Sequence, residues 1–146
     1  MTGLGQDLGV RDAVDVILRD GSTMRLRAPL QADVSAIVAF FEGLSVHSRF
    51  LRFHGLAAAG ERFARTLVEP DWEEKGSFVG VMGEGDEEQI VALGNYVRLR
   101  DRHTAEAAFA VADDYQRNGI GTRLLEQLAA RASEHGIDAF VAEVLS

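Results

Sequence analysis

Residues 115–128 read YQRNGIGTRLLEQL, with two glycines one residue apart between a polar, basic lead-in and a leucine-rich run. The leucine spacing indicates a helix that begins near Gly121, and the residues before Tyr115 alternate in the manner of a strand. A strand that turns into a helix leaves backbone N–H groups without partners at the start of that helix. Such groups, together with the positive end of the helix dipole, attract anions. The stretch therefore predicts either an anion-binding turn or a tight connection.

The two glycines are compatible with both alternatives. Gly119 and Gly121 lack Cβ atoms, so either a ligand or a sharp turn can bring atoms close to the backbone. Arg117 and Arg123 could add positive charge beside a phosphate. Two nucleotide motifs are excluded: a P-loop requires Gly-Lys-Ser/Thr, and a dinucleotide fingerprint requires a third glycine where Leu124 stands. A diphosphate ligand fits the remaining geometry.

Composition excludes several classes of protein. The chain has 146 residues, 47% of them apolar, enough for one domain with a sizeable core. It has no cysteine, which excludes a disulfide framework, a thiolate nucleophile and Cys-based metal sites. A net charge of −8 argues against a nucleic-acid partner. Without a membrane-length apolar run or a signal peptide, we expect a cytoplasmic protein with no membrane partner.

The surrounding segments predict one mixed α/β domain. Residues 1–14 are expected to form a loose N-terminal arm, and residues 15–146 the folded domain. An Asp20-Gly21 turn predicts a hairpin over residues 15–29. Helices are expected over residues 34–44, 45–55, 61–70 and 122–135, and further strands over 77–83, 90–99, 103–113 and 137–146.

Two of these elements have assignable faces. Alternation in the strand over residues 103–113 separates Glu106, Ala108 and Ala110 on one face from Ala105, Ala107, Phe109 and Val111 on the other. The following helix is expected to bury a stripe and to end at Gly136. The members of that stripe are Leu124, Leu125, Leu128, Ala129 and Ala132.

The turn resembles a known motif. Residues 116–121, Gln116-Arg117-Asn118-Gly119-Ile120-Gly121, match the Q/R-x-x-G-x-G/A signature of the GNAT superfamily of N-acetyltransferases. The likeness extends from about Met24 to Val144 and implies the GNAT fold, a mixed, mostly antiparallel sheet with flanking helices. A complete GNAT domain continues with another helix and two strands. The resemblance therefore implies either a domain of a larger multidomain chain or a partner chain that supplies those elements.

The resemblance also implies a cosubstrate, acetyl-CoA. Its pyrophosphate would be held by backbone amides of Gln116, Arg117, Asn118, Gly119, Ile120, Gly121 and Thr122. Its pantetheine arm would pair with backbone groups of Phe109, Ala110 and Val111, and the thioester would lie between the strands that contain residues 107–112 and 139–144. No metal is implied, and the four histidines have no metal-ligand spacing.

A narrower likeness concerns the acceptor. Residues 18–55, including SVHSRFLRF, and the segment AEAAFAV are similar to the acetyltransferase domain of bacterial protein lysine acetyltransferases. Some of those are joined to an acyl-CoA-synthetase-like region or to a cyclic-nucleotide-binding domain. This likeness implies a protein substrate with an acceptor lysine, with acyl-CoA synthetases as candidates. A small-molecule amine acetyltransferase and a non-catalytic acyl-CoA-sensing module remain as alternatives.

Acetyl transfer to lysine requires a base, because a free lysine amine has a pKa near 10.4. A carboxylate close to the thioester can accept the proton. Glu106 matches the catalytic glutamate of the protein-acetyltransferase subfamily and is the leading candidate. The alternative is a solvent-exposed glutamate on an edge strand, paired with Arg98 or Arg100. Glu143 is a second candidate for the base.

Two further groups concern acceptor recognition. Residues 49–53 alternate basic and aromatic side chains, which suits either an acceptor groove or a core-facing helix. Trp72 and its acidic neighbours predict a patch for a cationic acceptor. Those neighbours are Glu69, Asp71, Glu73 and Glu74. Asp113 and Asp114 are interpreted as turn residues.

Overall fold

The computed structural model describes residues 13–44 and 60–141, and its six strands form a single sheet in chain order. The strands are β1 (Val14–Ile17), β2 (Thr23–Arg27), β3 (Lys75–Met82), β4 (Gln89–Arg98), β5 (Thr104–Val111) and β6 (Ala139–Val141). Neighbours from β1 to β5 are antiparallel, and β6 runs parallel to β5. This arrangement confirms the expected mixed, mostly antiparallel sheet.

The first hairpin turns at the predicted residues. Gly21 has a φ of 90°, and Asp20 Oδ1 accepts a hydrogen bond from the Ser22 N–H at 2.9 Å. Val14 pairs with Leu26 and begins β1, one residue before the expected start of the folded domain.

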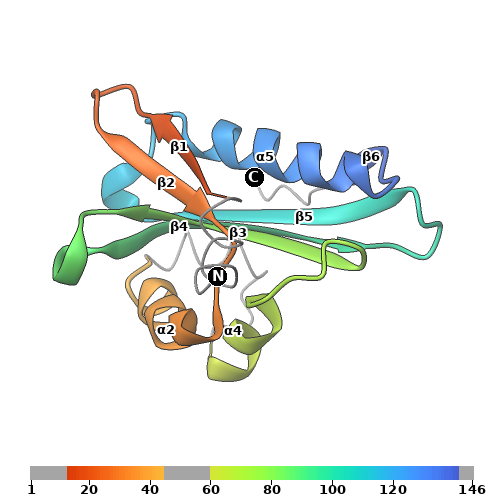
Figure 1. The fold of residues 1–146 in the computed structure, drawn as a ribbon, viewed down its shortest axis with the longest axis horizontal. Coiled ribbons are helices and arrows are strands. Elements are labelled where there is room, and N and C mark those ends of the chain that lie inside the picture. Colours follow the sequence, from red (N-terminus) through yellow and green to blue (C-terminus); the bar gives the residue numbers. More distant parts are fainter. Residues whose placement is uncertain (1–12, 45–59, 142–146) are drawn as a thin grey trace, which may run out of the picture.

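Helices cover both faces of the sheet. The helix α5 (Ile120–Glu134) lies along one face, and α2 (Val34–Glu42) and α4 (Glu61–Leu67) lie on the opposite side (Figure 1). Short 3-10 turns occupy Gln31–Asp33, Gly85–Glu87 and Asp113–Tyr115. The helix expected over residues 45–55 lies outside the described residues, as do the last five residues of the strand expected over 137–146. In the described residues no helix is long and apolar enough to cross a membrane.

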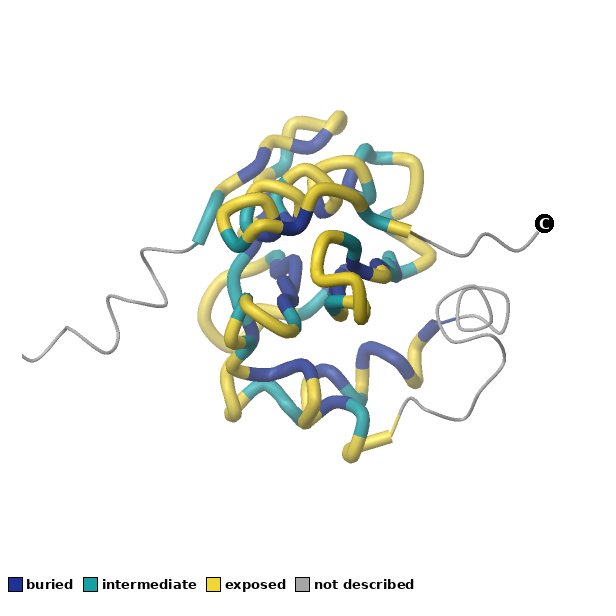
Figure 2. Tube along the Cα trace, turned by 90° about the vertical axis from the view of Figure 1, so that its right-hand side faces the viewer, coloured by how far each residue is buried: buried dark blue, intermediate teal, exposed yellow. Residues whose placement is uncertain are grey.

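Alternation along the strands builds a separate core on each face, because successive strand side chains point to opposite sides. Figure 2 colours the Cα trace by burial, and buried residues lie along the strands and in parts of the helices that cover them. The core under α5 includes Met24, Phe78, Tyr96, Leu124 and Leu128. The core under α2 and α4 includes Ile37, Phe41, Leu67, Val79 and Leu93.

The buried stripe of α5 is narrower than predicted. Leu124, Leu128 and Ala132 are at most 1% exposed, whereas Leu125 is 42% exposed. Residues four apart return to the same side of a helix, while the next residue is rotated by about 100° and points away from the sheet. Leu125 and the exposed Ala129 therefore do not anchor the helix, and Ile120 completes the buried row instead.

A mostly buried ion pair fixes the start of α2 to β2. Arg27 donates two hydrogen bonds to the Asp33 carboxylate, at 2.7 and 3.0 Å, and the Leu30 N–H donates a third at 2.7 Å. Burial alone would raise the pKa of Asp33, but the hydrogen bonds from Arg27 and Leu30 outweigh it and lower the pKa below its ordinary 3.8. Since the folded state favours the ionised carboxylate, Asp33 stabilises the fold at pH values above its ordinary pKa. This stabilisation is lost as the pH falls through the lower folded-state pKa.

Replacing Asp33 with asparagine should therefore destabilise the protein in a pH-dependent way. Near neutral pH we expect the free energy of unfolding to fall by about 1.5–3 kcal/mol, the usual contribution of hydrogen bonds to a charged group. The difference should shrink as the pH falls through the folded-state pKa, where wild-type Asp33 is protonated as well. Urea unfolding over a pH series measures it.

The matched control is Asp15→Asn. Asp15 pairs with Arg25 at 3.0 Å, but both side chains are more than half exposed. Because exposed ion pairs are weak, this variant should lose less than about 1 kcal/mol. Equal losses in the two variants would contradict the role assigned to the buried pair.

Candidate active site

The turn between β5 and α5 exposes backbone at the start of a helix. Gly119 is the N-cap residue of α5, with a φ of 83°, and it has no side chain to cap the first N–H groups. Arg117 has a φ of 71°, an uncommon conformation for a residue other than glycine. A Cβ atom added at Gly121 would meet nothing within 4 Å. The backbone of this turn is therefore open to a ligand.

The turn is attached to the end of β5. Gln116 Nε2 donates a hydrogen bond to the Val111 carbonyl at 3.1 Å. Asp113 and Asp114 are exposed and lie in the 3-10 turn between Val111 and Gln116. This placement agrees with their interpretation as turn residues.

One edge of β5 faces away from β4. The Leu99 N–H bonds to the Thr104 carbonyl, and the Ala112 N–H bonds to the Val91 carbonyl, at the two ends of the β4–β5 ladder. Because antiparallel pairs alternate between hydrogen-bonded and non-hydrogen-bonded, every second residue of β5 directs its backbone groups away from β4. These residues are Ala105, Ala107, Phe109 and Val111.

The outer edge of β5 is paired over only part of its length. The strand β6 pairs with Thr104, Ala105 and Glu106. Within residues 13–44 and 60–141, no strand pairs with Phe109 or Val111 on that side. Of the three residues predicted to contact pantetheine, these two direct backbone groups to the open edge, whereas Ala110 directs its own toward β4.

Glu106 lies beside the point where this pairing ends. It is exposed, and it stands opposite Val97 on β4 and Val141 on β6. Directly paired residues point to the same face of a sheet, so the carboxylate lies between two valines that are 48% and 49% exposed. Since β6 pairs with this part of β5, Glu106 is not on an edge strand.

The face that carries Glu106 also has a small cleft under α4. Its volume is about 110 Å³, and its lining is mostly apolar. Val97, the cross-strand neighbour of Glu106, forms part of the wall. The remaining lining residues are Phe63, Thr66, Leu67, Lys75, Gly76, Ser77 and Asn95.

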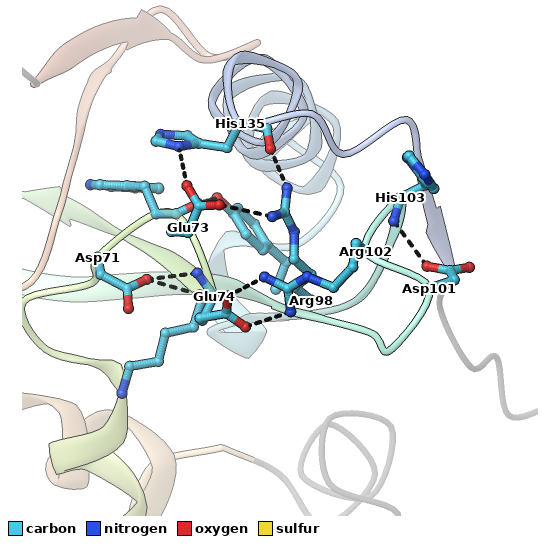
Figure 3. A network of polar contacts seen from close by, with 11 residues as sticks. Asp71, Glu73, Glu74, Arg98, Asp101, Arg102, His103 and His135 are labelled. Atoms are coloured by element: carbon cyan, nitrogen blue, oxygen red, sulfur yellow. Dashed lines mark hydrogen bonds and ion pairs between the residues drawn. The ribbon is translucent and has the colours of Figure 1, made fainter.

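Arg98, one of the two arginines considered as alternative partners of Glu106, contacts other groups. Its side chain is only 5% exposed, and it donates to the Glu73 carboxylate at 3.0 Å and to the His135 carbonyl (Figure 3). His135 Nδ1 also lies 3.1 Å from Glu73 Oε1. Arg98 thus connects the loop before β3 to the end of α5, and the alternative in which it neutralises Glu106 is wrong.

Two other acids near Trp72, Asp71 and Glu74, also make contacts within the chain. Glu74 forms a two-bond ion pair with Arg102, and Asp71 Oδ1 accepts the N–H groups of Glu74 and Lys75 (Figure 3). These internal contacts explain the acidic character of the loop without an acceptor. The sequence does not reveal the ion pair of Glu74, because its partner Arg102 lies 28 residues away.

Trp72 belongs to the face opposite Glu106. The Arg131 guanidinium lies 4.4 Å from the centroid of the Trp72 ring, and the Tyr96 hydroxyl donates to the Trp72 carbonyl at 2.6 Å. Burial raises the pKa of Tyr96 to about 12, which keeps it a hydrogen-bond donor at neutral pH. The loop therefore packs under α5.

Several predicted residues lie outside the described part of the chain, namely Glu143, Arg49, Phe50, Arg52 and Phe53. Within the described ranges, no group of three or more histidine, aspartate or glutamate side chains could hold a metal ion.

An open helix start, an open strand edge and a carboxylate beside it are thus arranged along β5. Residues 49–146 match the Acetyltransferase (GNAT) family. The chain belongs to this family. It is 33% identical over 134 residues to Acetyltransferase Pat of Mycolicibacterium smegmatis, which covers 91% of this chain but only 40% of Pat.

Solved structures agree with the GNAT fold. The GNAT domain of S. lividans PAT has a TM-score of 0.81 and 31% identity, covering 92% of this chain and 80% of that one. A cAMP-binding acyltransferase from Mycobacterium smegmatis, an R-to-K mutant, has a TM-score of 0.61 and 29% identity, covering 92% of this chain and 39% of that one. The expected GNAT fold is confirmed.

Proposed function

We propose that this GNAT chain transfers the acetyl group of acetyl-CoA to a lysine amine of a protein, with Glu106 as the general base. The observation that carries the proposal is the alignment along β5 of the open turn at Gln116–Thr122, the open edge at Phe109 and Val111, and Glu106. A phosphate group, an extended amide-bearing arm and a thioester follow one another in the same order in acetyl-CoA.

The residues at the turn fit the pyrophosphate. Backbone N–H groups at the start of α5 can donate to its oxygens, and the helix dipole favours its charge. Gly121 has open space where a side chain would otherwise stand in the way. The amides of the pantetheine arm can pair with Phe109 and Val111 in the way that an added strand would.

Glu106 lies toward the end of β5 that is farther from the turn. There it would accept a proton from the acceptor amine. The amine nitrogen attacks the thioester carbonyl carbon, a C–N bond forms and the C–S bond breaks. The amine proton passes to Glu106, directly or through a water, and CoA leaves as a thiolate that is then protonated. Val97 and Val141 offer apolar surface to the aliphatic stem of a lysine.

The preference for a protein acceptor is supported by the segments SVHSRFLRF and AEAAFAV, which are similar to bacterial protein lysine acetyltransferases. Acyl-CoA synthetases are the first candidates for the acceptor. This choice concerns the substrate only, and the roles of the turn and of Glu106 do not depend on it.

The test combines calorimetry with acetyl transfer. We expect acetyl-CoA to bind, and label from [acetyl-¹⁴C]acetyl-CoA to appear on a lysine of an acyl-CoA synthetase, located by mass spectrometry. An acceptor in which that lysine is replaced by arginine is the control.

Each other outcome contradicts a different part of the proposal. Label on small amines alone would contradict the protein acceptor, and binding without transfer would indicate a sensing module. If acetyl-CoA does not bind, the glycine turn is only a connection.

A further inference from the structure

A surface depression lies beside the turn, between the β1–β2 hairpin and the first two turns of α5. Its volume is about 370 Å³, within the usual range of ligand pockets. The hairpin side contributes Ile17 and Arg19, and the α5 side contributes Asn118, Gly119, Thr122 and Arg123. The depression therefore adjoins the amides proposed to hold the pyrophosphate.

Two of the three arginines near this depression lack the carboxylate partner that five arginines elsewhere in the described residues have. Arg25, Arg27, Arg65, Arg98 and Arg102 each pair with a carboxylate. In the part of the chain that the structure describes, Arg19 and Arg117 have no carboxylate within ion-pair distance, and both side chains belong to exposed residues. Arg123 pairs at 3.3 Å with Glu126, which also lines the depression.

The two unpaired arginines are close to each other despite their distance in sequence. Arg19 Nη1 donates to the Arg117 carbonyl at 3.4 Å, across a separation of 98 residues. The Arg19 Nε atom also lies 3.7 Å from the position that a Cβ of Gly119 would occupy. Two positively charged side chains therefore lie beside the depression, in a chain whose net charge is −8.

We infer that Arg19, together with Arg117, binds the 3′-phosphate of the coenzyme A moiety, so that the β1–β2 hairpin forms part of the coenzyme site. The inference rests on the proposed function, which places the pyrophosphate at the adjacent helix start. Coenzyme A carries its third phosphate on the ribose that follows the pyrophosphate. Guanidinium groups match the geometry of phosphate oxygens, and a phosphate monoester there would neutralise both charges.

The consequence is selectivity between coenzyme A and its dephospho form, which lacks only this phosphate. Exposed ion pairs contribute about 0.2–1 kcal/mol each, or roughly two- to fivefold in affinity. With two arginines, we expect the wild-type protein to bind coenzyme A about tenfold more tightly than dephospho-coenzyme A. Added salt should reduce this ratio because the charges are exposed.

Calorimetry with both ligands on wild type, Arg19→Gln and Arg100→Gln tests the inference. Arg19→Gln should weaken binding of coenzyme A about threefold and leave dephospho-coenzyme A unchanged. Arg100→Gln removes the same charge from an exposed residue at the opposite end of β5 and should change neither affinity. Thermal unfolding of each variant checks that the fold is retained, as expected for exposed residues.

The outcomes separate this inference from the proposed function. Equal affinities of the wild-type protein for the two ligands would overturn the inference and leave the pyrophosphate site intact. An equal loss for both ligands in Arg19→Gln would also overturn it, because the arginine would then act through the turn. If neither ligand binds wild type, the proposed coenzyme site fails and the inference fails with it.

Discussion

Glutamine in place of Glu106 is expected to lower kcat for acetyl transfer about 10²- to 10⁴-fold, the usual contribution of a general base. Glutamine has nearly the same size but cannot accept the amine proton, so the acceptor nitrogen stays cationic and is not nucleophilic. The affinity for acetyl-CoA should remain unchanged, because the turn at the far end of β5 holds the coenzyme in our proposal. Steady-state kinetics and calorimetry on the same preparation measure the two effects separately.

The pH dependence of this variant distinguishes a base from a structural residue. As the pH rises toward the lysine pKa near 10.4, more of the acceptor amine is already neutral, and the deficit of Glu106→Gln should shrink. Glu134→Gln removes the same charge from an exposed position at the end of α5 and serves as the matched control. A kcat for Glu106→Gln equal to that of the control at neutral pH would exclude the proposed role.

Glutamate at position 121 is expected to weaken acetyl-CoA binding about 100-fold, because it would bring a carboxylate to the helix start where the pyrophosphate is proposed to bind. The protein itself should tolerate the change. The added side chain has open space, and a negative charge in the first turn of α5 interacts favourably with the helix dipole. Calorimetry should therefore show a lower affinity of Gly121→Glu for acetyl-CoA. Thermal unfolding should show an unchanged or slightly raised Tm for the same variant.

Two control variants show whether the charge of the new glutamate, its size or its position in α5 causes the loss of affinity. Gly121→Gln has similar bulk without the charge and should lose less affinity than Gly121→Glu. Ala130→Glu places the same charge at an exposed position farther along α5 and should bind acetyl-CoA normally. Normal binding by Gly121→Glu would mean that the phosphate groups do not lie at this turn.

Local patterns predicted most of the secondary structure. The Asp20-Gly21 turn, the alternation of β5 and the sharp entry into α5 depend on residues close in sequence, so propensity and periodicity are sufficient. The width of a buried helix stripe depends on what the helix packs against. Helical spacing alone includes Leu125 in the stripe, whereas the packing of α5 on the sheet buries only the row that includes Leu124 and Leu128.

The partners of charged groups were not predictable in the same way. Arg98 was, with Arg100, a candidate partner of Glu106 in the alternative to a catalytic role. Its actual partners, Glu73 and His135, are separated from it by 25 and 37 residues. Side chains on adjacent residues of a strand point to opposite faces, and Arg98 falls on the face of α5 while Val97 falls on the face of Glu106.

The sequence by itself determined the family resemblance, the glycine turn and the face of β5 that carries Glu106, because each follows from a short run of residues. Only the tertiary structure decided that β6 pairs with β5 as far as Glu106, that Val97 and Val141 flank this carboxylate, and that Arg19 reaches the turn. The physical reason is that strand register and helix placement depend on packing between distant segments. These contacts join residues up to 98 positions apart.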